Sequence, residues 1–309
     1  MERNGGFDFQ DMKKIVSVSL GSSSRDHSVV VNFNNQDWKI SRIGCDGDLA
    51  TCRQRYLEMD NKVDAFGMGG IDRWLWIGDR RYQFNDAAKL VAGLKTFIAD
   101  GSGLKHYIES ELVTNLLNEK KILKSTDKVL MVSGLDRWGM AKAFHDGGCD
   151  VLYGDLIFGL DLPIGINHLE KLARVGRTIL PVVTKLPFKW LYPTGEKQEE
   201  NTGKASRWFK GRDVIAGDFH YIKRNIPNDL TGKTIVTNTT TEEDVKMLKS
   251  KGLKWLVTTT PRLEGRSFGT NVIEAFFFGV KESNKLSQND YKTLSKELDF
   301  SGNIERLNK

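Results

Sequence analysis

The sequence has few of the residues that staple a small secreted protein or hold a structural metal. Its 309 residues include three cysteines, Cys45, Cys52 and Cys149, which form no CxxC pair, and five dispersed histidines. Three cysteines are too few for a disulfide framework, and without a Cys-His cluster we expect no metal site. A reducing, cytoplasmic location is therefore expected.

Long apolar runs are also missing. The sequence contains no apolar run of about 18 residues, the length that a membrane-spanning helix needs. Its first 15 residues, MERNGGFDFQDMKKI, are polar and contain no apolar h-region. We therefore expect neither a secretory signal peptide nor a membrane partner.

Charge of one sign is only slightly in excess, with 46 Lys+Arg against 40 Asp+Glu and a net charge of +6. The basic residues are interleaved with acidic ones and form no arginine-rich tract, so we expect no nucleic-acid partner. A small anionic ligand or simple solubility explains the excess equally well. The remaining composition, 39% hydrophobic and 28% charged, is typical of a globular protein, and the length favours two domains.

The pattern of residues 13–100 predicts an N-terminal mixed α/β domain, preceded by a flexible N-terminus at residues 1–12. Apolar and β-branched segments predict strands at 15–20 and 63–70, and hairpins over 28–43 around NNQD and 74–84 around Gly78. Apolar residues at helical spacing predict helices at 47–61 and 85–100.

Residues 101–126 are predicted to form a helical linker to a second domain, 127–282. Strands are predicted at 128–133, 149–156, 213–221, 233–239 and 254–261, with helices between several of them. Strands that alternate with helices favour a Rossmann-like, doubly wound sheet. An insertion at 160–212 is expected to cover an active site or form a subunit contact, so a homodimer is possible; a C-terminal helix and tail, 283–309, complete the chain.

The strongest local signal is the GLDRWG turn that follows the strand KVLMVS. Glycines in such a turn let the backbone approach a pyrophosphate, and an acid at the end of the next strand accepts hydrogen bonds from a ribose. Methyltransferases that use S-adenosylmethionine also place an acid there. The pattern therefore predicts NAD or NADP, with S-adenosylmethionine as the alternative. The predicted cofactor-binding residues are Gly134, Asp136, Arg137, Gly139, Asp155, Thr259 and Thr260.

Several segments resemble a bacterial family labelled quinate 5-dehydrogenase, among them SVSLGSSSRDH, VDAFGMGGID, DGSGLK, YGDLIFGL, AGDFHYI and TTTPRLEGRSFGTNV. The resemblance covers roughly residues 13–282. It implies an NAD(P)-dependent oxidoreductase that acts on a hydroaromatic hydroxy acid. KWLVTTTPRLEG and FGTNVIEAFFFGV are also similar to the nucleotide-binding half of shikimate and quinate dehydrogenases.

The catalytic Lys-Asp motifs of shikimate and quinate dehydrogenases do not occur before residue 127. The best substitute is Lys105 with Asp100, because the glycines of DGSGLK let both side chains face one cavity. The lysine would stabilise an alkoxide and the aspartate would orient it. His220, predicted to share one face of a strand with Asp218, is a second candidate proton carrier.

Further polar residues are predicted to bind the anionic groups of a small substrate. Arg binds carboxylates and phosphates bidentately, and helix N-termini attract anions. The predicted substrate-binding residues are Ser22, Ser23, Arg25, Asp72, Arg266 and Ser267.

Three functions remain open. The first is an NAD(P)-dependent oxidoreductase that acts on a small hydroxy-carboxylic acid in a cleft between the domains, and the family resemblance favours it. The second is an S-adenosylmethionine-dependent methyltransferase built on the same Rossmann-like unit. The third is a non-catalytic small-molecule sensor.

Overall fold

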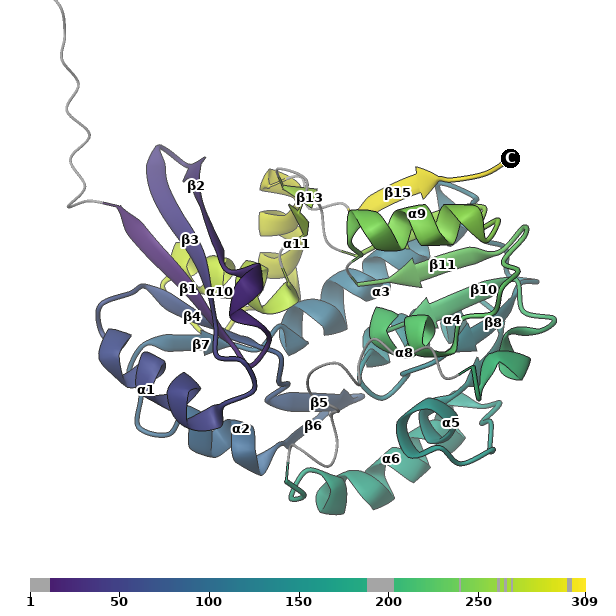
Figure 1. Ribbon diagram of the computed structural model, residues 1–309, viewed down its shortest axis with the longest axis horizontal. Coiled ribbons are helices and arrows are strands. Elements are labelled where there is room, and N and C mark those ends of the chain that lie inside the picture. Colours follow the sequence, from purple (N-terminus) through teal and green to yellow (C-terminus); the bar gives the residue numbers. More distant parts are fainter. Residues whose placement is uncertain are drawn as a thin grey trace, which may run out of the picture.

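A computed structural model describes residues 12–187, 203–238, 240–259, 262–263, 266–267, 269–298 and 302–309. The fold is mixed α/β with two largely parallel sheets, which lie toward opposite ends of the long axis in Figure 1. Helix α3 (Ser102–Asn118) and the hairpin of β5 (Trp74–Ile77) and β6 (Arg80–Gln83) lie between them (Figure 1). The α/β class is confirmed.

The first sheet has the order β2-β3-β1-β4-β7. Its strands are β1 (Lys13–Ser19), β2 (His27–Phe33), β3 (Gln36–Gly44), β4 (Ala65–Gly69) and β7 (Phe97–Ala99). All neighbours are parallel except β2 and β3, which form the predicted hairpin. Asn34 and Asn35 turn that hairpin with positive φ angles of 52° and 60°, which asparagine tolerates better than most residues.

The second sheet has the order β15-β12-β11-β10-β8-β9. Its strands are β8 (Lys128–Met131), β9 (Asp150–Tyr153), β10 (Val214–Gly217), β11 (Thr234–Thr237), β12 (Trp255–Thr258) and β15 (Asn303–Arg306). Only β15 runs antiparallel, and the sequence did not predict it. A two-residue pair, β13 (Arg262–Leu263) and β14 (Arg266–Ser267), completes the described strands.

The remaining helices cover the sheets. They are α1 (Leu49–Met59), α2 (Asn85–Leu90), α4 (Trp138–Asp146), α5 (Asp155–Leu160), α6 (Leu169–Val183), α8 (Phe219–Asn225), α9 (Glu242–Ser250), α10 (Thr270–Lys281) and α11 (Gln288–Glu297), with short 3-10 turns η1 (Ser23–Arg25) and η3 (Ser206–Phe209). Helix α9 begins after Thr241, whose side chain forms a capping box with Asp244. None of the helices in the described ranges is long and apolar enough to cross a membrane.

Helix α10 corrects the predicted boundary at residue 282. It packs against β1, β4 and β7 of the first sheet, with every residue from Val272 to Gly279 buried. Phe276 meets the Trp38 ring edge-on at 5.0 Å between centroids. The chain therefore returns to the first sheet after the second has formed, and β15 then returns to the second.

Three predicted elements end earlier than expected. The helix predicted at 85–100 ends at Leu90, and Gly93, with φ of +77°, leads the chain into β7. The strand predicted at 213–221 ends at Gly217, and the Asp218 side chain caps α8. Similarly, the strand predicted at 149–156 stops at Tyr153, so Asp155 opens a short helix.

Within the predicted insertion, α6 carries a regular apolar stripe that packs on the core. Its buried residues Leu169, Leu172, Ala173, Gly176 and Leu180 recur at helical spacing. Residues 188–202 of the predicted insertion at 160–212, and residues 1–11 of the predicted flexible N-terminus at 1–12, lie outside the described residues.

Candidate functional site

Six charged side chains meet between the two sheets, and we call them the buried charge cluster: Asp72, Lys105, Glu109, Asp136, Arg137 and Asp218. Their positions follow from the topology. Asp72 follows β4, Asp136 and Arg137 follow β8, and Asp218 follows β10, while α3 contributes the other two. Parallel strands place their carboxyl ends at one edge of a sheet, where ligands bind in open α/β folds.

Lys105 pairs with carboxylates from both sheets. Its Nζ lies 2.7 Å from Asp72 Oδ1 and 3.1 Å from Asp136 Oδ1. Lys105 lies on α3, in the segment predicted as a helical linker, and the residue is only 8% exposed. One ammonium group therefore connects the strand ends of the first sheet to those of the second.

Arg137 lies between the end of β8 and the start of α4, and it is 1% exposed. Its guanidinium bonds the Glu109 carboxylate, which stands one helical turn from Lys105 on α3. It also lies 3.3 Å from Asp218 Oδ2 and, through Nε, 3.6 Å from Asp136 Oδ2. Buried charges are tolerated when they are paired in this way.

Polar neighbours fix these carboxylates. Asn238 donates its side-chain amide to Asp218 Oδ2 at 3.0 Å, and the Thr259 hydroxyl donates to Glu109 Oε1 at 3.3 Å. The backbone amide of Asp218 donates to the Ser133 hydroxyl at 3.0 Å. Thr259, a predicted cofactor-binding residue, is thus part of this network.

Three aspartates form the open side of the cluster. The side chains of Asp72, Asp136 and Asp218 are 18–19% exposed, whereas those of Arg137 and Glu109 are 1% exposed. A molecule that approaches from solvent therefore meets carboxylates first. The cluster holds four carboxyl groups and two cations, which leaves an excess of negative charge when all are ionised.

Burial and pairing set the protonation of this cluster. Burial raises the pKa of Asp72 to about 6, even though the Lys105 ammonium opposes it. Burial lowers the pKa of Lys105, but Asp136 and Asp72 outweigh that effect and hold it above its ordinary value. Both pKa values rise, because at Asp72 burial outweighs the attraction of the ammonium, whereas at Lys105 the two carboxylates outweigh burial. Lys105 therefore stays charged, and Asp72 holds a proton more readily than an exposed aspartate.

The predicted dyad of Lys105 and Asp100 is not formed, because the Asp100 carboxylate accepts hydrogen bonds from backbone amides. Its Oδ2 accepts hydrogen bonds from the amides of Arg73 and Trp74 at 2.7 and 2.8 Å. Its Oδ1 accepts from the Ser102 hydroxyl at 2.7 Å. Lys105 instead pairs with Asp72, which had been predicted as a substrate-binding residue.

The predicted pyrophosphate turn is filled by the protein itself. Asp155 accepts hydrogen bonds from the amides of Gly134 and Leu135 at 3.0 and 2.7 Å, and burial raises its pKa to about 6. A Cβ on Gly139 would lie 2.1 Å from the His106 carbonyl oxygen. Gly139 therefore allows α4 to approach α3. Asp155, the acid predicted to bind a ribose, instead accepts hydrogen bonds from the amides of the turn.

The other predicted residues form no part of the paired charges or lie outside the description. His220 is exposed on α8, where its backbone amide donates to Asp218 at 2.9 Å and its ring lies close enough to interact electrostatically with that carboxylate, so the predicted shared strand face is wrong. Exposed residues at η1 and its cap include Ser22, Ser23 and Arg25. Arg266 and Ser267 form β14 through their backbone, while their side chains and Thr260 lie outside the described residues.

Two members of the cluster were missed as site residues. Glu109 lies four residues after Lys105 on one helix face, a spacing that the sequence displays. Asp218 was noticed only as a neighbour of His220. In the described ranges, no three His, Cys, Asp or Glu side chains are grouped so as to hold a metal ion.

No curated protein matches the sequence, so its resemblance to the quinate 5-dehydrogenase family stays a prediction. Solved structures are similar over most of the chain. A solute-binding protein of an ABC transporter from Burkholderia multivorans is 12% identical, with 95% of this chain and 98% of that chain covered and a TM-score of 0.37. The arabinose-binding component from Shewanella sp. ANA-3 is 9% identical, with 94% and 98% covered and a TM-score of 0.36. A glutamate dehydrogenase variant is 11% identical, with 93% and 72% covered and a TM-score of 0.47.

The oxidoreductase function and its methyltransferase alternative are corrected. The geometry gives the physical reason: Asp155 occupies the turn amides expected to hold a cofactor, and the expected catalytic dyad is not formed. Binding of NAD, NADP or S-adenosylmethionine stays a prediction.

Two family models cover nearly the whole chain. Residues 14–98 match a domain of unknown function, DUF8753, and residues 103–307 match a second one, DUF8754. The division between them falls beside the predicted boundary at residue 100. Because the second model spans more than half of the sequence, the chain belongs to the DUF8754 family.

Proposed function

We propose that this chain is a non-catalytic sensor that binds a small, neutral, hydroxyl-rich molecule at the buried charge cluster. One observation carries the proposal. Three partly exposed aspartates, which follow strands of both sheets, surround two buried cations that are already paired.

The chemistry of the open side selects the ligand. An ionised carboxylate only accepts hydrogen bonds, so a ligand that meets Asp72, Asp136 and Asp218 must bring donors. Hydroxyl groups supply donors without adding charge. An anionic ligand is disfavoured because carboxyl groups outnumber cations in the cluster.

The state of Lys105 supports binding without turnover. Carboxylates of Asp72 and Asp136 hold its pKa above the ordinary value, so the ammonium is no general base near neutral pH. Its role in the proposal is to orient the carboxylates. Asn238 orients Asp218 in the same way through its hydrogen bond of 3.0 Å.

A thermal-shift assay with myo-inositol, D-ribose and L-arabinose tests the proposal, with Asp136→Asn as the site variant. The matched control is Asp146→Asn on α4, where the side chain is 53% exposed. A ligand at about a hundred times its Kd stabilises the native state by about 2.7 kcal/mol. We expect stabilisation by at least one polyol, weakened in Asp136→Asn and retained in Asp146→Asn. No stabilisation by any of the three, or an equal one in Asp136→Asn, would refute the proposal.

A further inference from the structure

Strand β2 forms one edge of the first sheet, because in the described part of the chain it pairs with β3 alone (Figure 1). Its seven residues, HSVVVNF, include no Asp, Glu, Lys, Arg or Pro. The register with β3 runs from His27 to Phe33 without a bulge. Charged side chains, prolines and bulges are the devices that stop an edge strand from pairing with another chain, and β2 has none of them.

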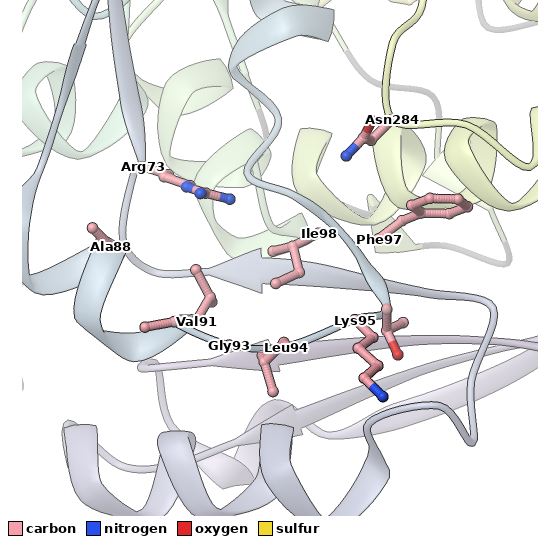
Figure 2. A pocket seen from close by; sticks show the side chains of 11 residues that line it. Arg73, Ala88, Val91, Gly93, Leu94, Lys95, Phe97, Ile98 and Asn284 are labelled. Atoms are coloured by element: carbon pink, nitrogen blue, oxygen red, sulfur yellow. The ribbon is translucent and has the colours of Figure 1, made fainter.

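The other edges of the two large sheets are protected within the described ranges. β7 has only three residues, and Figure 2 shows a hollow beside it whose lining includes the charged Arg73 and Lys95. Ile166 forms an isolated bridge with β9. β15 has four residues, of which Glu305 and Arg306 are charged. Among these four edges, β2 is therefore the longest and the least protected.

Backbone groups along β2 point alternately toward β3 and toward the open edge. The two-residue turn of Asn34 and Asn35 makes the pair that flanks it a hydrogen-bonded one, and every second residue of β2 repeats that pairing. The residues in between direct their N–H and C=O groups to the open edge. They are Ser28, Val30 and Asn32.

The neighbouring elements leave this edge open. Helix α10 covers a face of the sheet, where Phe276 meets Phe33 edge-on at 5.7 Å between ring centroids. The turn η1 folds toward β3, and Arg42 donates to the Ser22 carbonyl oxygen there at 2.9 Å. Val30, at the middle of β2, is 58% exposed. The described elements therefore leave room for a partner strand.

The strand is complementary to a second copy of itself. Antiparallel pairing about a two-fold axis at Val30 places Val30 opposite its own copy and Ser28 opposite Asn32. These residues direct their backbone groups outward, so the two strands exchange hydrogen bonds reciprocally. The Asn32 amide donates to Asp37 at 2.6 Å, and its oxygen can accept from the Ser28 hydroxyl of the second copy. No like charges meet along the two strands, because β2 contains no Asp, Glu, Lys or Arg.

We propose that two copies of this chain form a symmetric dimer by antiparallel pairing of their β2 strands, which joins the two first sheets into one. Sedimentation equilibrium of the full chain from about 1 µM to about 1 mM tests it. The site variant is Val30→Lys, which places two lysines opposite each other. Its matched control is Val182→Lys, because Val182 is an exposed valine on α6. Strand β2 contributes no residue to the buried charge cluster, so this test and the polyol test fail independently.

Cross-linking tests the register. Residues of a hydrogen-bonded antiparallel pair have Cα atoms about 5.5 Å apart, a separation that a disulfide spans. Val30→Cys should therefore form a covalent dimer with oxidised glutathione. Ser28→Cys should not, because its two copies are offset by four residues along the strands and lie more than about 7 Å apart.

We expect a dimer whose Kd rises at least about tenfold in Val30→Lys and stays unchanged in Val182→Lys. A monomer over the whole concentration range, or a dimer that Val30→Lys does not weaken, would overturn the proposal. So would a failure of Val30→Cys to cross-link, or cross-linking of Ser28→Cys to the same extent.

Discussion

Replacing Arg137 with methionine tests the energetics of the buried charge cluster. The change removes the cation that bonds Glu109, and both side chains are 1% exposed. Among the described residues, Glu109 would keep a hydrogen bond from the Thr259 hydroxyl at 3.3 Å and the more distant charge of Lys105, whereas Asp218 would keep Asn238. Removing one partner of a buried ion pair costs about 3–5 kcal/mol, because the other charge is left uncompensated. We expect Arg137→Met to lose stability in that range at pH 7.

The loss should depend on pH. Burial already raises the pKa of Glu109, with Arg137 opposing that rise, so removing the arginine raises the pKa further. The stability lost by Arg137→Met should therefore shrink as the pH is lowered from 8 to 5 and Glu109 takes up a proton. In Arg137→Met with Glu109→Gln, the combined loss should be smaller than the sum of the single losses.

Urea unfolding, followed by tryptophan fluorescence and by far-ultraviolet circular dichroism, measures these differences. Lys142→Met is the control, since that lysine pairs with Asp146 on the surface and both side chains are more than half exposed. Such a pair contributes roughly 0–1 kcal/mol. A loss below about 1 kcal/mol for Arg137→Met, or one that is the same at pH 5 and pH 8, would refute the reasoning about the buried pair.

Two further predictions concern packing and titration. Gly139→Ala should destabilise the protein by about 2 kcal/mol or more in urea unfolding, because its Cβ would lie 2.1 Å from the His106 carbonyl oxygen and α3 and α4 would have to separate; an unchanged midpoint would contradict that close packing. Burial raises the pKa of Glu274 to about 7, so its contribution to stability is complete below about pH 4.5 and is lost as the pH rises through 7. Between pH 5 and pH 8, Glu274→Gln should lose about 2–3 kcal/mol less stability than the parent, and parallel pH profiles of the two proteins would contradict that assignment.

Much of the fold follows from local signals in the sequence. The asparagine turn between β2 and β3 determines structure within a few residues and was predicted correctly. The Thr241 cap of α9 and the apolar stripe of α6 are local signals of the same kind. The strand β15 was missed because its four residues, NIER, carry little apolar pattern, and it exists only by pairing with β12.

Errors arose where one residue type serves two purposes. Aspartate at the end of a strand can accept hydrogen bonds from a ribose or from backbone amides, and Asp155 bonds the amides of its own fold. Asp218 looked like part of an alternating strand, yet its carboxylate caps α8. The sequence alone does not distinguish these cases, because the choice depends on which backbone groups the fold brings near.

The candidate site was predicted only in fragments. Lys105, Asp72, Asp136 and Arg137 were all selected, but for separate catalytic, substrate-binding and cofactor-binding roles. Their assembly depends on contacts between the ends of strands in two sheets, at separations of 31 and 33 residues for the two Lys105 pairs. Only the folded chain reveals that they form one cluster.

The most direct test of the account is titration calorimetry of the unmodified protein with myo-inositol and, separately, with quinate. The two molecules are both polyhydroxylated rings, and quinate also carries a carboxylate. If the buried charge cluster selects neutral donors, myo-inositol will bind and quinate will bind at least about tenfold more weakly, a difference of about 1.4 kcal/mol. Quinate binding as tightly as myo-inositol or more tightly would contradict the proposed polyol site.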